Sequence, residues 1–260
     1  MAKAAWKKFP HADKVYVFAG AALKKNWERL HRGDREPYPA DAAVQEAWRL
    51  YHQGEFHKAC EAGLAAGADG YNAANKAAMI YANYLETDDK RKLALFQEIS
   101  ERCEELQQAQ PKNANAYYIQ AYALGRYSQG ISVIKALTQG LGGKIKSALE
   151  TAIKLEPKHA DAYSALGAYH AEVVDKVGAM VGKLTYGASK DVAVKHFASA
   201  LKIAPDSAIA CIEYANSLVM LFGQARMDEA VKLYEKAAAA TPLDAMERLD
   251  VELAKSELED

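Results

Sequence analysis

Four copies of one residue pattern, each ending in a proline, constrain the fold of this chain more than any other feature of its sequence. In every copy, three apolar or small residues and the proline are separated by 4, 3 and 5 positions. The copies are Ile99, Cys103, Leu106 and Pro111; Ile145, Leu149, Ala152 and Pro157; Ala193, Phe197, Ala200 and Pro205; and Ala230, Tyr234, Ala237 and Pro242. Spacings of 4 and 3 place side chains on one face of a helix, and proline cannot continue that helix. The pattern therefore predicts helices that stop before each proline.

A second pattern follows three of these prolines. Six, nine and ten positions after the proline there is an anchor residue, a larger residue and a small residue. The three sets are Tyr117, Gln120 and Ala121; Tyr163, Leu166 and Gly167; and Cys211, Tyr214 and Ala215. This spacing predicts a further helix after each proline, packed against its neighbour through the small residue.

Together the two patterns resemble the tetratricopeptide repeat over roughly residues 44–242. The resemblance implies an all-α fold in which helix-turn-helix hairpins, four to five in number, stack into a right-handed superhelical solenoid with a concave groove. We expect three parts: an N-terminal covering helix or arm at 1–40, the repeat domain at 41–242, and a charged capping helix at 243–260.

The repeats are longer than the usual length of about 34 residues, because successive prolines are 46, 48 and 37 residues apart. The extra residues fall near 125–146 and 171–192, and both stretches carry apolar residues at helical spacing. One interpretation is that first helices are extended, or extra helices are added, and pack on each other. The alternative is that the long hairpins enclose a cavity for a small apolar ligand near Val177, Met180 and Tyr186.

Inserts of this kind, with the tail AVKHFASALKIAPDS after YGASKD, also resemble two further families. One is the regulators of microtubule dynamics, which include bacterial relatives, and the other is the tetratricopeptide component associated with tripartite transporters in bacteria. A bacterial source is expected. The transporter component is normally exported, whereas the N-terminus MAKAAWKKFPHADK has no apolar run of the signal-peptide kind.

Composition limits the location and the partners. The three cysteines are far apart and fit a reducing compartment, and no run of eighteen apolar residues exists, so a cytoplasmic protein without a membrane span is expected. The formal net charge of -1 gives no overall attraction to nucleic acid. Residues 1–35 are basic and residues 243–260 acidic, so self-assembly through the two ends is one hypothesis. The sequence leaves the oligomeric state open.

Motifs for chemistry are lacking. The stretch GLGGKIKS is similar to a phosphate loop, but Thr138 occupies the position of the first glycine and Ile145 follows the lysine. The histidines do not have metal-ligand spacing. We therefore expect no enzyme activity, no cofactor and no metal.

The resemblance also implies which residues face the groove, because these lie mainly on the first helix of each repeat. By register they are Tyr118, Tyr122 and Arg126; Ser164, Ala168 and Glu172; and Ile212, Asn216 and Met220. Tyr, Arg and Asn combine apolar area with hydrogen bonding. The function predicted is a scaffold that binds a protein or peptide segment.

The segment HADKVYVFAGAALKKNWERLHRGD does not fit the repeat. It predicts a helix with Tyr16, Leu23, Trp27 and Leu30 inward, ending at Gly33. This segment either covers the first repeat or occupies a groove, in its own chain or in a neighbouring one. The sequence leaves both open.

Overall fold

A computed structural model describes residues 5–259, and within that range the chain is helical with no strand. The longer helices are α1 (Ala21–Leu30), α2 (Ala42–Gln53), α3 (Phe56–Ala65), α4 (Tyr71–Tyr84), α5 (Asp89–Ala109), α6 (Ala114–Ile131), α8 (Leu141–Leu155), α9 (Ala160–Val177), α11 (Lys190–Ile203), α12 (Ala208–Phe222), α13 (Met227–Ala238) and α14 (Ala245–Glu259). Two short helices, α7 (Val133–Thr138) and α10 (Ala179–Tyr186), lie between longer ones. The all-α prediction is confirmed.

The repeat prolines follow helix ends, as predicted. Helices α5, α8 and α11 end two residues before Pro111, Pro157 and Pro205. The next helix then begins at a side-chain cap, because Asn113, His159 and Ser207 each accept a hydrogen bond from a backbone N–H of the first turn. Stop and start signals thus fix the hairpin turns locally.

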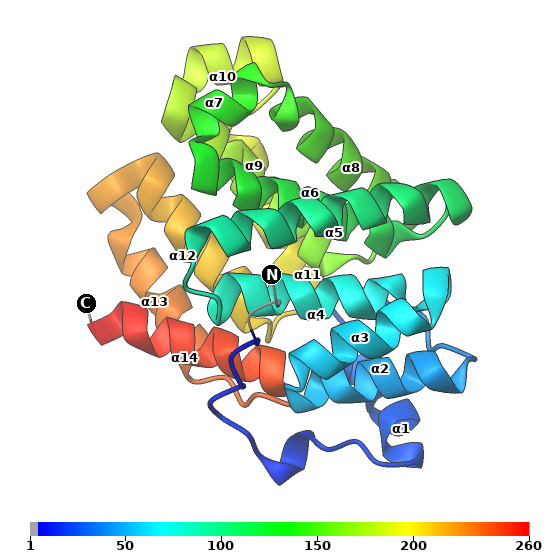
Figure 1. Ribbon diagram of the computed structural model, residues 1–260. Coiled ribbons are helices and arrows are strands. Elements are labelled where there is room, and N and C mark those ends of the chain that lie inside the picture. The colour runs from blue at the N-terminus through cyan, green and yellow to red at the C-terminus, as the bar shows by residue number, and fades with distance from the viewer. Residues whose placement is uncertain (1–4, 260) are drawn as a thin grey trace.

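The helices pair into five hairpins within the described residues: α2 with α3, α4 with α5, α6 with α8, α9 with α11, and α12 with α13. The first helices also contact one another in the order α2, α4, α6, α9 and α12. Helix α14 packs on α12 and α13 and reaches α2, as the red and blue ribbons at the lower edge of Figure 1 show. The first and last parts of the solenoid therefore meet, and the inner layer surrounds an interior.

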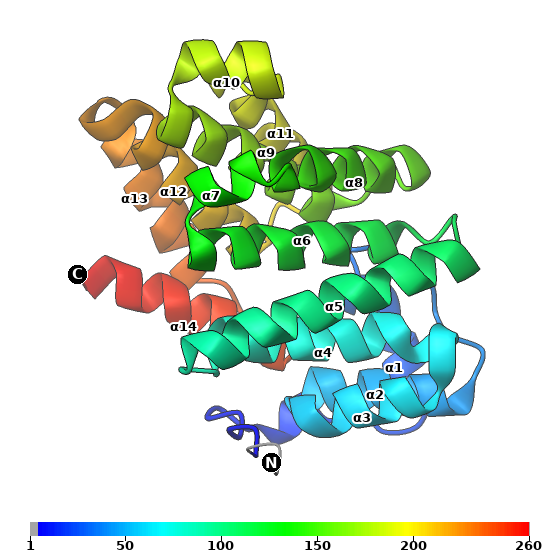
Figure 2. The same cartoon turned by 45° about the horizontal axis from the view of Figure 1, so that its top comes forward.

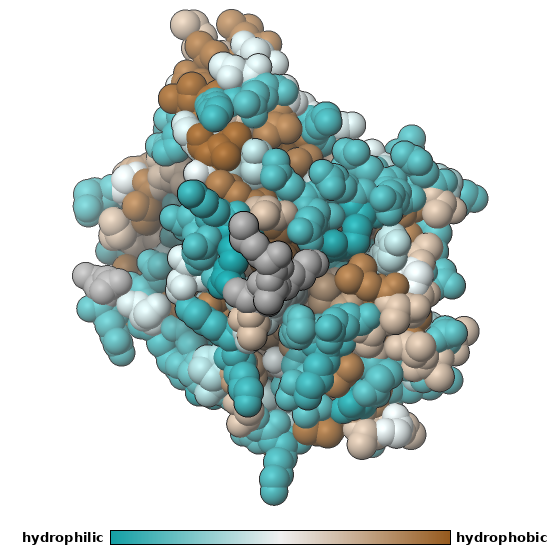
Figure 3. Space-filling view, viewed as in Figure 1, coloured by the Kyte–Doolittle hydropathy of each residue, from teal (hydrophilic) through white to brown (hydrophobic). Residues whose placement is uncertain are grey.

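The extra residues of the long repeats form α7 and α10, which both contact α9; in Figure 2, α10 lies at the top and α7 lies below it beside α6. Hydrophobic side chains gather on the surface at the top of Figure 3, and Leu184 and Met180 of α10 are 81% and 74% exposed. The insertions near residues 125–146 and 171–192 therefore contain extra helices, as one of the two interpretations predicts. None of Val177, Met180 and Tyr186 is among the residues that line the two cavities described below, and the prediction of an apolar space near these three residues stays a prediction.

The N-terminal segment is folded onto the solenoid. Tyr16, Leu23, Trp27 and Leu30 are buried, as predicted, although only residues 21–30 form α1. Beyond α1 the chain enters the interior, where Gly33 accepts a backbone hydrogen bond from Asp161 of α9 at 3.1 Å. Part of the concave face is therefore occupied by the chain itself.

One stretch of the described residues, 208–238, is long and apolar enough on average to be a candidate membrane span. It folds as α12 and α13, which turn back on each other at Gly223, and half of its most apolar part is buried in the protein. Core helices of a repeat protein have the same composition, so this is weak evidence for a span.

Candidate functional site: the concave interior

A cavity of about 110 Å³ opens among α6, α7, α8, α9 and α12. Apolar side chains form the wall on the side of the inserted helix α7. The residues of this wall are Val133, Ala136, Leu137, Ile145, Leu149 and Val173. The repeat insertion near residues 125–146 therefore contributes one wall of the cavity.

The polar wall of the cavity is formed by residues of α6, α9 and α12. Arg126 donates a hydrogen bond to Glu213 at 2.7 Å, and its guanidinium lies over the ring of Tyr122 with the centroid 5.2 Å away. Gln129 donates to Glu172 at 3.3 Å. Burial raises the pKa of Glu172 above the usual value for glutamate.

Two polar groups on this wall lack partners. Ser164 is 6% exposed, and within residues 5–259 its hydroxyl has no hydrogen-bond partner. One turn earlier, the carboxyl group of Asp161 makes no side-chain hydrogen bond or ion pair with any described residue. Burial raises the pKa of Asp161 to about 6, although the positive charge of Lys76 opposes this shift. The hydroxyl of Ser164 is buried, and a buried polar group without a partner costs folding free energy. The half-buried carboxyl group of Asp161 lines the same cavity, so the two groups together mark a place that a ligand can satisfy.

A second, smaller cavity of about 60 Å³ adjoins the first. The two share Tyr118, Tyr122, Asp161 and Ile209 as lining residues, so they meet at the middle of the inner layer. The second cavity continues toward Asp250 of α14, which accepts a hydrogen bond from Tyr84.

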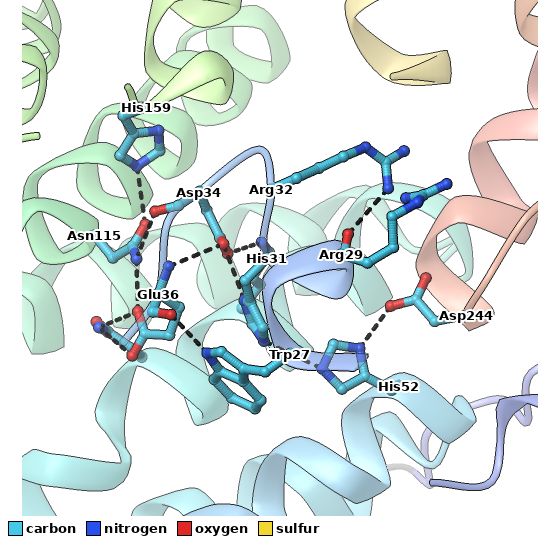
Figure 4. A network of polar contacts seen from close by, with 12 residues as sticks. Trp27, Arg29, His31, Arg32, Asp34, Glu36, His52, Asn115, His159 and Asp244 are labelled. Carbon is cyan, nitrogen blue, oxygen red and sulfur yellow. Dashed lines mark hydrogen bonds and ion pairs between the residues drawn. The ribbon is translucent and has the colours of Figure 1, made fainter. Parts of the chain in front are cut away.

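The N-terminal segment supplies a network of paired polar groups beside these cavities (Figure 4). Asp34 is 2% exposed, lies 2.9 Å from Nδ1 of His31 through its Oδ1, and forms an ion pair with Lys76 of α4. These two neighbours hold the pKa of Asp34 well below its usual value, although burial acts in the opposite direction. Burial lowers the pKa of His31 to about 4.

Amides of two inner helices hold the rest of the segment. Asn72 donates to Glu36 at 2.9 Å and Asn115 donates to it at 2.6 Å. His159 bridges to the next helix, because its Nε2 lies 2.9 Å from Oδ1 of Asn115 and its Nδ1 accepts from the N–H of Ala162. Burial lowers the pKa of His159 to about 4, so the ring is neutral at neutral pH and can fill both roles.

The C-terminal end closes onto the same segment. His52 of α2 lies 2.6 Å from Asp244 through Nδ1 and 3.2 Å from His31 through Nε2. Arg32 forms an ion pair with Glu247 at 2.8 Å. The self-assembly hypothesis pairs basic residues of 1–35 with acidic residues of 243–260 of another chain. Here Arg32 and Glu247 form such a pair within a single chain.

The structure brings several predicted groove residues together. Tyr118, Tyr122, Arg126, Ser164 and Glu172 all line the first cavity. By contrast, Asn216 and Met220 lie on an exposed part of α12, where Asn216 accepts a hydrogen bond from Tyr234 of α13. These two residues do not line the first cavity, so their predicted binding role stays a prediction for a different surface.

Sequence reasoning missed Asp161, Asp250 and Lys76 as residues of this interior. A signal was present for Lys76, because it stands with Asn72 and Asn75 among the small and apolar residues of α4. Polar residues inside such a helix need buried partners, which indicates a polar interior. Within residues 5–259, no group of three His, Cys, Asp or Glu side chains can hold a metal ion.

Comparisons with known proteins identify the family and the fold of this chain. A family model described as regulator of microtubule dynamics protein 1-3 matches residues 43–259. The chain belongs to this family. The match extends from α2 to α14 and thus includes every hairpin and all the residues that line the first cavity, whereas Leu30, Arg32, Gly33 and Asp34 of the second cavity lie before it.

Among solved structures, a thermophilic TPR protein from Thermus thermophilus is similar, with a TM-score of 0.57 and 18% identity. The alignment covers 82% of this chain and 97% of that one. This likeness confirms the tetratricopeptide-like helical repeat fold. No curated protein matches the sequence.

Proposed function

We propose that this protein is a non-catalytic scaffold that binds a segment of a partner protein in the first cavity. The observation that carries the proposal is the cavity itself, which lies on the inner layer between an apolar wall and a polar wall. Repeat solenoids use this inner surface for binding.

The two walls have different roles in the proposed binding. An apolar side chain of the partner enters between Leu137, Leu149 and Val173 and gains free energy from burial. Tyr122 and Arg126 form the rim, where an aromatic ring and a guanidinium fix polar groups of the partner. Ser164 supplies a hydroxyl that has no partner among the described residues.

The family description names regulators of microtubule dynamics, so microtubules are the first partner to test. The bacterial source and the cytoplasmic location belong to the same proposal, and cell fractionation with an antibody to the native protein tests the latter.

The test is co-sedimentation with microtubules and capture of partners from lysate, with the wild type and two variants compared side by side. The variant Y122A/R126A should lose at least ten-fold in binding while its circular dichroism spectrum stays helical. The variant N216A/M220A changes the exposed part of α12 and should bind like the wild type. A folded Y122A/R126A protein that binds normally would contradict the proposal.

A second candidate function is the binding of a small apolar ligand. The observation that favours it is the apolar wall formed by α7 and α8, which shields one side of the cavity. Native mass spectrometry of the purified protein distinguishes the candidates, because an added mass of a few hundred daltons that disappears on denaturation would indicate such a ligand.

A further inference from the structure

The charges that line the two joined cavities are out of balance. Nine charged residues line them, of which three are basic and six are acidic. The basic residues are Arg32, Lys76 and Arg126, and the acidic residues are Asp34, Asp161, Glu172, Glu213, Glu247 and Asp250. Each basic residue already has an acidic partner, through the pairs Lys76–Asp34, Arg32–Glu247 and Arg126–Glu213.

Within residues 5–259, three of these carboxyl groups form no ion pair with a basic side chain: Asp161, Glu172 and Asp250. Glu172 accepts a hydrogen bond from Gln129 and Asp250 accepts one from Tyr84, both of which are neutral. Asp161 has no side-chain partner among residues 5–259, and the nearby hydroxyl of Ser164, 6% exposed on the same cavity wall, has none either. Asp250 is buried, Asp161 and Glu172 are half-buried, and burial raises the pKa of all three carboxyl groups. A cation placed beside them would favour their ionised forms and pair with them.

Tyrosine rings line the same cavities as these carboxyl groups. Tyr84, Tyr118 and Tyr122 line the second cavity, and the last two also line the first. Tyrosine rings attract ammonium and guanidinium groups through their negative faces, most strongly where water is excluded. Carboxylates together with aromatic rings are the combination that recognises an organic cation.

We infer that the joined cavities bind an alkyl cation, with an ammonium or guanidinium group between Asp161 and the tyrosines and its apolar stem along α7 and α8. This inference rests on the proposed function and specifies its ligand. The cation comes either from a basic side chain of the partner segment or from a free amine, since both present the same chemistry.

Proton release accompanies such binding. The free protein holds part of the Asp161 carboxyls in the protonated form near pH 6, because burial and the charge of Asp34 raise the pKa of Asp161 to about 6 against the effects of Lys76 and Arg32. A cation beside Asp161 favours the ionised form and lowers that pKa. A proton therefore leaves the protein when the cation enters at this pH.

The test is calorimetric titration of the full chain at pH 6 with octylammonium chloride, with octanol and octanoate as matched probes. Octylammonium should bind at least ten-fold more tightly than either. Its apparent enthalpy should depend on the ionisation enthalpy of the buffer, which reports proton release. D161N should weaken binding at least ten-fold and reduce the buffer dependence. E172Q, an independent removal of a carboxylate from the wall, should weaken binding as well.

Equal binding of octanol and octylammonium, or no binding of octylammonium by the wild type, would overturn the inference. In that case, capture of a partner that is lost in Y122A/R126A would still support the scaffold, so the two failures are distinguishable. Competition between octylammonium and the captured partner would assign the cation to the partner segment. A co-purified amine seen by mass spectrometry would assign it to a free molecule.

Discussion

Two neighbouring parts of the interior both hold buried polar side chains, but they differ in how these are paired. In the network of the N-terminal segment, Asp34 is held by His31 and Lys76, and Asn115 joins Glu36 to His159. In the cavities, Asp161 and the hydroxyl of Ser164 have no side-chain partner within residues 5–259. Satisfied networks rigidify a fold. Missing partners alone do not mark a site, because the Tyr51 hydroxyl and Asn72 Oδ1 also lack partners within residues 5–259 and line neither cavity. The contrast teaches that an unpartnered polar group marks a site where it also lines a cavity, as Ser164 does.

The largest effect expected from this contrast is on the paired side. K76M removes the positive charge beside the buried carboxylate of Asp34, and breaking a buried ion pair on one side costs about 3–5 kcal/mol of unfolding free energy. Urea denaturation at pH 8 measures it. D161N is the matched control in the cavity and should leave stability equal to or above that of the wild type. Equal losses in both variants would remove the distinction between the two regions.

The two regions should also differ in how their contributions to stability depend on pH. His159 has a pKa lowered from 6.5 to about 4, so the unfolded chain binds a proton there that the folded chain does not. Its contribution to stability is complete above pH 6.5 and is lost as the pH falls toward 4, by about 3 kcal/mol. For Asp161, whose pKa is raised to about 6, the sign is opposite, and stability is lost as the pH rises from about 4 to 6. Unfolding measured from pH 4 to 8 should show a shallower acid loss in H159Q and a steeper one in D161N, and parallel profiles for the two would contradict this account.

A smaller effect is expected where the two regions touch. A Cβ added at Gly33 would overlap with Oδ1 of Asp161, so the Asp161 side chain would have to turn away. G33A should destabilise the protein by about 1–3 kcal/mol through overpacking. In the background of D161A the crowding atoms are absent, so the same change should cost much less. A double-mutant cycle measures this coupling, and additive costs would show that the contact is unimportant.

The sequence predicts the hairpins well because their signals are local. The prolines at 111, 157 and 205 and the capping residues after them set helix ends without help from distant parts of the chain. The register of the repeat also places Tyr122 and Arg126 on the cavity wall, since the first helices of a solenoid share one orientation.

The polar contacts of the interior could not be predicted from local sequence patterns, because they form only when distant parts of the solenoid come together. Asp34 and Lys76 are 42 positions apart in sequence, and His52 and Asp244 are 192 apart. Asp161 stands in the first turn of α9, where an acidic residue is ordinary because of the helix dipole. Its place between two cavities follows from the entry of Gly33 and from the meeting of α14 with α2, which no local pattern records.

The most direct measurement is an NMR titration of the side-chain carboxyl groups of Asp161 and Asp34, in the free protein and with octylammonium added. In the free protein Asp161 should titrate near pH 6 and Asp34 well below the ordinary range of aspartate. With octylammonium the pKa of Asp161 should fall while that of Asp34 stays unchanged. The central claim is that the joined cavities bind an alkyl cation beside Asp161. It would be contradicted if Asp161 titrated at the ordinary value for aspartate, or if its pKa did not change when octylammonium was added.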